Sequence, residues 1–189
     1  MNTPRIIQAL EEYPVIAAVR EEKMLKTAVE SKAGVIFLLQ ADIFNLQQRV
    51  DTVVRAKKSV LIHLDFVDGL GRDNRAIDYI KEVIRPQGII STRSSQIKYA
   101  REIGLFGIQR FFLLDSLSYE TTVKTAHAAQ PDMIEIMPGL MPGMIRRITA
   151  QLSVHVIAGG LVETKQEVME ILAAGALAVS TGKSELWEL

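Results

Sequence analysis

Short apolar runs alternate with amphipathic stretches along the whole chain. Eight such runs occur, and each is followed by a polar or glycine-containing turn and a segment of helical periodicity. Near-continuous hydrophobicity over four or five residues is typical of parallel strands that are covered on both faces. The predicted strands are Val15–Val19, Val35–Leu39, Val60–Leu64, Gly88–Ser91, Arg110–Leu114, Met133–Met137, Val154–Ala158 and Leu177–Ser180.

The stretches between these runs predict helices. Asp73–Ile84 carries its large apolar side chains on one stripe, as an amphipathic helix does. Thr164 and Glu167 have the spacing of a capping box, and Pro142 suits the first turn of another helix. Ahead of the first strand, a short helix that begins near Thr3 has the apolar side chains needed to close the bottom of a barrel.

Eight strand–helix units predict an α/β fold, namely a compact (βα)8 TIM-type barrel that spans residues 1–189 as a single domain. An open doubly wound sheet is less suitable because it usually has about five or six strands. Barrels of this type run to about 250 residues and have a usual lower limit near 200. A chain of 189 residues must therefore have short loops and some reduced outer helices.

Composition limits the location and the partner classes of the protein more than it limits its chemistry. The absence of cysteine excludes disulfides and thiolate metal sites, and a formal net charge of zero predicts no bulk attraction to nucleic acid or to anionic membranes. No window approaches the ~18 consecutive apolar residues of a membrane span, and the acidic N-terminal stretch does not resemble a signal peptide. We therefore expect a cytoplasmic protein without a membrane partner.

The turns after the last two predicted strands have the character of a phosphate site. Barrels often hold phosphate there, and the residues in question are Gly159, Gly160, Ser180, Thr181 and Gly182. Glycine lets backbone N–H groups approach an anion closely, and the hydroxyls add donors at the start of a short helix whose dipole favours negative charge. Either turn alone would be an ordinary glycine turn, but together they predict an anion site.

Polar residues gather at the other predicted strand ends: Arg20, Gln40, Asp65, Arg93, Asp115 and Glu135. Asp65 and Glu135 could form a general acid–base pair, accept hydrogen bonds from ligand hydroxyls, or balance arginines. Arg20 and Asp115 could equally form a surface ion pair or a helix cap. His63 shares a strand face with Asp65, one layer deeper, where a buried core histidine is the simpler interpretation.

Several kinds of site are absent. No lysine ends a strand where a Schiff-base aldolase needs it, no His and carboxylate cluster has metal-ligand spacing, and no nucleotide-binding glycine motif follows a strand. We expect no metal and no cofactor. The glycine-containing stretch Asp65–Asp73 is either a lid over the mouth or an ordinary turn.

Six segments in this order carry a family resemblance: HLDFVDGL, GIISTR, IQRFFLLDS, IEIMPGLMP, VIAGGLVETK and AGALAVSTGKSELW. From about Val15 to Trp187 the chain closely resembles the bacterial glycerol uptake operon antiterminator regulatory proteins. The resemblance implies a barrel without catalytic activity that senses glycerol 3-phosphate and acts on the leader mRNA of glycerol-utilisation genes. It assigns the phosphate to the loops at Gly159, Gly160, Ser180, Thr181 and Gly182, and the glycerol hydroxyls to Arg20, Asp65, Ser91, Asp115 or Glu135.

The residues themselves support a small phosphorylated polyol as ligand, whereas RNA binding is implied by the resemblance alone. Two alternatives remain at this point. The chain could be an isomerase, epimerase or lyase on a small sugar phosphate, with Asp65 and Glu135 as base and acid, or a scaffold that keeps an unused phosphate site. Trp187 and Leu189 could seal the barrel edge or form the interface of a homo-oligomer.

Overall fold

Eight parallel strands close into a barrel in the computed structural model, which describes residues 3–189. The order around the barrel is β1–β10–β9–β8–β7–β6–β4–β2, as the sequence predicted for a (βα)8 fold. The strands are β1 (Val15–Val19), β2 (Val35–Leu38), β4 (Ser59–His63), β6 (Gly88–Ser91), β7 (Phe106–Phe112), β8 (Met133–Met137), β9 (His155–Gly159) and β10 (Ala178–Thr181).

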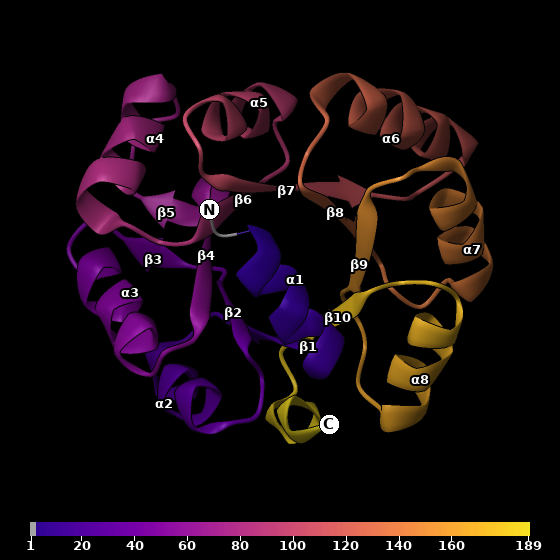
Figure 1. Ribbon diagram of the computed structural model, residues 1–189, viewed down its shortest axis with the longest axis horizontal. Helices are drawn as coiled ribbons and strands as arrows, with labels where there is room; N and C mark the ends of the chain where they lie inside the picture. Colours follow the sequence, from indigo (N-terminus) through magenta and orange to yellow (C-terminus); the bar gives the residue numbers. More distant parts are fainter. Residues whose placement is uncertain (1–2) are drawn as a thin grey trace.

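Helices form a ring around the barrel (Figure 1). They are α2 (Glu22–Glu30), α3 (Leu46–Arg55), α4 (Asn74–Tyr79), α5 (Ser94–Glu102), α6 (Ser116–Ala129), α7 (Pro142–Gln151), α8 (Lys165–Ala173) and the 3-10 helix η3 (Ser184–Glu188). The predicted helix Asp73–Ile84 is divided, because α4 continues into a π-helical turn, η2 (Ile80–Ile84). Within residues 3–189, no helix combines the length and apolar character that crossing a membrane requires.

The C-terminal segment closes the ring between α2 and α8 (Figure 1). Trp187 is fully buried there, and its indole Nε1 donates a hydrogen bond of 2.9 Å to the carbonyl of Thr181 at the end of β10. Leu189 packs against the same core. Trp187 therefore seals the barrel edge of its own chain and is not exposed for an interface.

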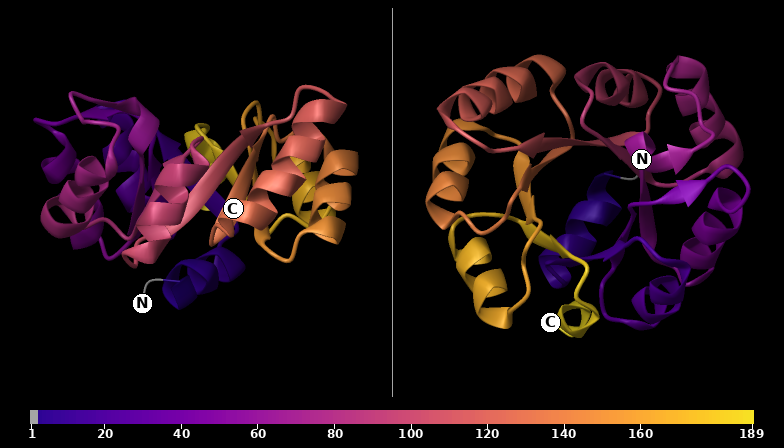
Figure 2. Two further views of the ribbon diagram at one scale, coloured as in Figure 1. Left: turned by 90° about the horizontal axis from the view of Figure 1, so that it is seen from above. Right: turned by 180° about the vertical axis from the view of Figure 1, so that it is seen from behind.

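A short helix, α1 (Thr3–Glu12), closes the N-terminal end of the barrel, as predicted. Figure 2 shows it lying beneath the strands. Its side chains Ile6 and Leu10 are buried in the cluster that fills the barrel interior, together with Phe37 and Ile108. The opposite end, where the strands terminate, stays open.

The largest boundary error is at β7, which begins at Phe106, four residues before the predicted Arg110, whereas the ends of β2, β4, β9 and β10 differ from the prediction by at most one residue. Gly107 and Gln109 interrupt the apolar run and hide the start of the strand in the sequence. Gly107 lies against α5, where an added Cβ would be 3.1 Å from Ile97, and the buried Gln109 donates from Nε2 to the hydroxyl of Ser94 at 2.9 Å. The longer strand places Arg110 on the inner face, in line with Phe106 and Ile108.

The loops after β2 and β4 are joined by a parallel ribbon of two short strands, β3 (Ala41–Asp42) and β5 (Val67–Asp68). Ala41 pairs with Val67, and Asp42 pairs with Asp68. The intervening turn, η1 (Leu64–Phe66), leads directly from β4 into the ribbon. The first part of the predicted lid is therefore held by main-chain pairing and is not a free loop.

Candidate ligand-binding site

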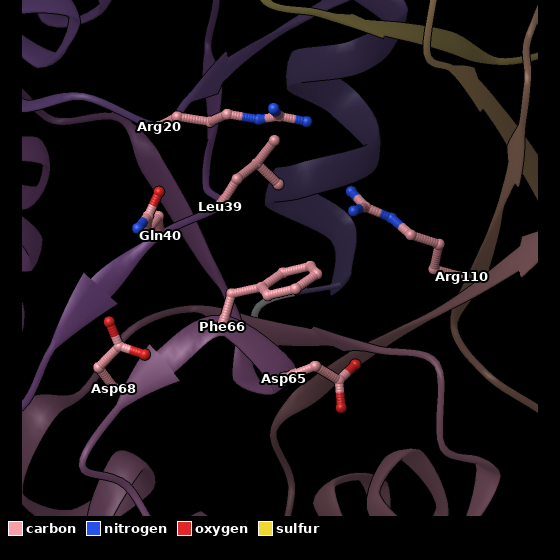
Figure 3. Close-up of a pocket in the computed structure, with 7 residues that line it drawn as sticks. All are labelled: Arg20, Leu39, Gln40, Asp65, Phe66, Asp68 and Arg110. Carbon is pink, nitrogen blue, oxygen red and sulfur yellow. The ribbon is translucent and has the colours of Figure 1, made fainter.

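Two adjoining cavities occupy the open end of the barrel and share Arg20, Leu39 and Arg110 in their lining. The first, which we term the loop lobe, has a volume of about 300 Å³ and lies beside the turns after β9 and β10. The second, the ribbon lobe, has a volume of about 280 Å³ and lies beside the β3–β5 ribbon. The seven residues that line the ribbon lobe appear in Figure 3: Arg20, Leu39, Gln40, Asp65, Phe66, Asp68 and Arg110.

Arg110 is the site residue that the sequence did not reveal. It lies opposite Glu135 on neighbouring strands, and its Nε donates to Oε2 of Glu135 at 2.6 Å. The hydroxyl of Ser180 donates to the other carboxylate oxygen, Oε1, at 2.5 Å. Glu135 is fully buried and Arg110 is 6% exposed, so both oxygens of the carboxylate are used inside the barrel.

The two terminal nitrogens of Arg110 have no hydrogen-bond partner in the described part of the chain, and they point into the cavity (Figure 3). Arg20, at the end of β1, extends its guanidinium toward the same space, and its side chain likewise has no partner within residues 3–189. Two guanidinium groups with unpartnered terminal nitrogens around one cavity favour an anionic ligand, because charge-assisted hydrogen bonds to carboxylate or phosphate are strong.

The turns after β9 and β10 contribute three of their five predicted residues to the loop lobe, namely Gly160, Ser180 and Gly182. Gly160 has a φ of +77°, which favours glycine. Gly159 serves packing instead, because a Cβ there would lie 2.0 Å from the Ser180 hydroxyl oxygen. The Thr181 hydroxyl is also occupied, since it donates to the carbonyl of Val162 at 2.8 Å and accepts from a backbone N–H at 3.1 Å.

The predicted contribution of a helix dipole at this site is not supported. The segment after β10 is η3, a 3-10 helix of five residues, whose aligned peptide dipoles are few. The neighbouring Lys183 pairs with Glu163 at 3.3 Å on the surface. The positive charge at the loop lobe therefore comes from Arg20 and Arg110.

Asp65 lines the ribbon lobe, but its carboxylate is already engaged. It accepts a hydrogen bond from the backbone N–H of Thr92 at 2.9 Å and from the Thr92 hydroxyl at 3.2 Å. The Ser91 hydroxyl lies 3.2 Å from the same oxygen and 2.7 Å from Oε1 of Gln96. Ser91 is buried outside the cavity lining, so it ties the end of β6 to η1 and does not face a ligand.

Asp115 lies apart from both lobes. It caps α6 in a capping box, where its carboxylate accepts from the backbone N–H of Ser118 at 2.8 Å. Hydrogen bonds from the Ser118 backbone and hydroxyl lower the pKa of this carboxyl. The structure therefore makes Asp115 a helix cap and does not bring it to the mouth.

His63 lies beneath the ribbon lobe, as its alternation with Asp65 predicted. It is 1% exposed, its ring centroid is 4.6 Å from that of Phe66, and its Nδ1 is 3.7 Å from Oδ2 of Asp65. Neither ring nitrogen has a hydrogen-bond partner within residues 3–189. Burial, and after it the nearby charge of Arg110, lower the pKa of His63 to about 4, so the ring is neutral at pH 7.

Both members of the predicted acid–base pair are hydrogen-bonded within the protein. Glu135 is fully buried and bound by Arg110 and Ser180, and Asp65 accepts two hydrogen bonds from Thr92. Within residues 3–189, no three His, Cys, Asp or Glu side chains are grouped to hold a metal ion. The described geometry favours holding an anion over performing proton transfer.

Comparisons with known proteins identify relatives. Residues 15–187 match the family model described as glycerol-3-phosphate responsive antiterminator. The uncharacterized protein YgcP of Escherichia coli (strain K12) is 35% identical over 184 residues, which cover 97% of this chain and 96% of that protein.

Solved structures of proteins described as antiterminators are also similar to this chain. The glycerol uptake operon antiterminator regulatory protein of Listeria monocytogenes is 37% identical, with a TM-score of 0.90 over 93% of this chain and 95% of the other. An antiterminator-related protein of Thermotoga maritima is 33% identical, with a TM-score of 0.83 over 93% and 98%. The aldolase QR15 is 13% identical with a TM-score of 0.72, over 93% and 92%, and shares the fold alone.

Proposed function

Because this chain belongs to the family of glycerol-3-phosphate responsive antiterminators, we propose that it senses glycerol 3-phosphate and controls antitermination through the leader mRNA of glycerol-utilisation genes. The observation that carries the ligand part of the proposal is a pair of guanidinium groups, Arg20 and Arg110, whose terminal nitrogens are unpartnered at the mouth of the barrel. The family is regulatory, so glycerol 3-phosphate is here an effector and not a substrate.

In this proposal the phosphate group binds in the loop lobe. Gly160 and Gly182 offer close approach to the backbone there, and Arg20 and Arg110 supply charge-assisted hydrogen bonds from the side shared with the ribbon lobe. Ser180 acts indirectly, because its hydroxyl holds Glu135, which in turn orients Arg110. No cofactor takes part.

Regulation requires that the binding of the ligand and the binding of the leader mRNA be coupled. The protein must have two states that differ in their affinity for RNA, and glycerol 3-phosphate must bind the RNA-competent state more tightly. By linkage, bound leader mRNA must then raise the affinity for glycerol 3-phosphate by the same factor. Action on mRNA during transcription places the protein in the cytoplasm.

The test is ligand binding by calorimetry and thermal shift, with glycerol 3-phosphate, glycerol and inorganic phosphate as probes. A ligand at about 100 times its dissociation constant stabilises the fold by ~2.7 kcal/mol. We expect glycerol 3-phosphate to do so and glycerol alone not to do so. Arg20→Gln should weaken glycerol 3-phosphate about tenfold through loss of a charge-assisted hydrogen bond.

Arg146→Gln is the matched control, because it removes the same charge from an exposed position on the outer helix α7. If Arg20→Gln and Arg146→Gln bind glycerol 3-phosphate equally well, the proposed site is wrong. If the wild-type protein does not bind glycerol 3-phosphate, the sensor function is wrong. Equal affinity for leader mRNA with and without the ligand would rule out the coupling.

A further inference from the structure

The ribbon lobe contains polar groups whose hydrogen-bonding capacity is unused. Asp65 is engaged with Thr92, whereas the side chains of Gln40 and Asp68 have no hydrogen-bond or ion-pair partner within residues 3–189. Both are exposed to the cavity that they line (Figure 3). The capacity to bind the polar end of a ligand thus lies with Gln40 and Asp68.

The β3–β5 ribbon places these two side chains on the same side of the lobe (Figure 3). Gln40 directly precedes β3, and Asp68 pairs with Asp42 of that strand. The backbone N–H of Ile43 donates to the carbonyl of Asp68 at 3.1 Å, which fixes the end of β5. The carboxylate of Asp42 is used locally, because it accepts from the backbone N–H groups of Phe44 and Asn45 at 2.8 and 2.9 Å.

An anion anchor lies on the other side of the same lobe. Arg110 is 6% exposed, and its terminal nitrogens are unpartnered and point into the lobe (Figure 3). A ligand whose phosphate contacts Arg110 and Arg20 from the loop lobe therefore directs the rest of its chain toward Gln40 and Asp68. The ligand is therefore oriented with its anionic end at the arginines and its opposite end at Asp68.

We propose that Asp68, with Gln40 beside it, is the specificity-determining group that selects phosphate esters carrying hydroxyls and rejects the corresponding ketone. This inference rests on the proposed function. An ionised carboxylate is only an acceptor, so it binds a hydroxyl, which donates, and opposes a carbonyl, which also only accepts. Glycerol 3-phosphate carries a hydroxyl at its central carbon where dihydroxyacetone phosphate carries a carbonyl.

The site therefore distinguishes two molecules that differ by two electrons and two protons at one carbon. A carbonyl oxygen placed against Asp68 leaves both groups without a donor, and an unsatisfied polar group lowers affinity by about 10- to 100-fold. The sensor consequently responds to the reduced, alcohol form of the triose and not to its oxidised form.

The test compares the dissociation constants of glycerol 3-phosphate, dihydroxyacetone phosphate and inorganic phosphate by calorimetry. The wild-type protein should prefer glycerol 3-phosphate to dihydroxyacetone phosphate by at least tenfold. In Asp68→Asn the amide both donates and accepts, so the preference should fall about tenfold toward unity. The ratio of the two constants is informative because the long-range effect of removing a negative charge acts on both ligands.

Asp51→Asn is the matched control, since it makes the same change on the outer helix α3 and should leave the preference intact. Gln40→Leu should weaken glycerol 3-phosphate severalfold and leave inorganic phosphate unchanged. If the wild-type protein binds both trioses equally, or Asp68→Asn keeps the full preference, this inference is wrong while the sensor function stands. If none of the three probes binds, both are wrong.

Discussion

Arg110 joins a buried carboxylate to an open cavity: its Nε binds Glu135 at 2.6 Å, and its terminal nitrogens face the ligand site. One guanidinium group thus serves the stability of the barrel and the binding of an anion. The Ser180 hydroxyl completes the arrangement from β10. Removing the charge of Glu135 should therefore lower the stability of the barrel and raise its affinity for an anion.

Glu135→Gln leaves Arg110 without its counter-charge inside the barrel. Breaking a buried ion pair costs about 3–5 kcal/mol, and we expect a loss near 3 kcal/mol because Arg110 still reaches the cavity. The affinity for inorganic phosphate should rise, since the guanidinium is no longer partly neutralised. Chemical denaturation and phosphate titration measure the two effects.

The control is Glu163→Gln, which removes a carboxylate from the surface pair with Lys183. Exposed pairs contribute about 0–1 kcal/mol, so the variant should unfold almost like the wild type. A Glu135→Gln protein as stable as Glu163→Gln would show that the buried pair does not support the fold.

Gly159 has a packing requirement that a double variant can isolate. A Cβ at this position would lie 2.0 Å from Oγ of Ser180 and 2.8 Å from Oε1 of Glu135. Gly159→Ala should cost about 1–3 kcal/mol through overpacking. Ser180→Ala removes the nearest atom, so the double variant should be more stable than the sum of the two single changes implies. Strict additivity in urea unfolding would contradict this.

His63 should make stability depend on pH. Its pKa is about 4 in the folded protein against 6.5 for an unperturbed histidine, so the unfolded chain binds a proton that the folded chain does not. The free energy of unfolding should therefore fall as the pH drops from about 6.5 to 4, by about 3 kcal/mol in total. His63→Gln should reduce this slope.

Exposed His127, on α6, supplies the comparison. His127→Gln removes a histidine that is open to solvent, and the slope between pH 6.5 and 4 should stay as in the wild type. Equal slopes for His63→Gln and the wild type would mean that His63 titrates normally.

Trp187, which is the single tryptophan of the chain, reports on the ligand site. Its indole donates to the carbonyl of Thr181, and the following residue, Gly182, lines the loop lobe. Ligand binding at Gly182 should therefore shift the tryptophan emission. Titration with glycerol 3-phosphate should give a saturable change, and glycerol at equal concentration should give none. An emission spectrum insensitive to a ligand that binds by calorimetry would place the ligand elsewhere.

The barrel could be predicted from the sequence because its strands are covered on both faces and appear as apolar runs. The start of β7 could not, because Gly107 and Gln109 break the run. That error made Arg110 the first residue of the predicted strand, and Arg110 was not predicted as a site residue. Once the strand begins at Phe106, alternation places Arg110 inside the barrel opposite Glu135.

The location of the candidate site at the strand ends was predicted from the sequence, but the hydrogen bonds within it were not. The sequence places polar residues at strand ends, but it does not show which of them are already bound. Asp115 is bound as a helix cap, and Ser91 is buried against Gln96 and Asp65. Asp68 was predicted only as part of the lid segment, because a two-residue strand such as β5 has no periodicity to detect.

The α1 plug has a kinetic consequence. With Ile6 and Leu10 packed into one end of the barrel, a ligand enters and leaves by the same opening. A macromolecule bound across that opening without touching the ligand would slow association and dissociation by an equal factor and leave the equilibrium constant unchanged. The lifetime of the occupied state would then be set by whatever covers the mouth, and a signal could outlast the concentration of effector that produced it.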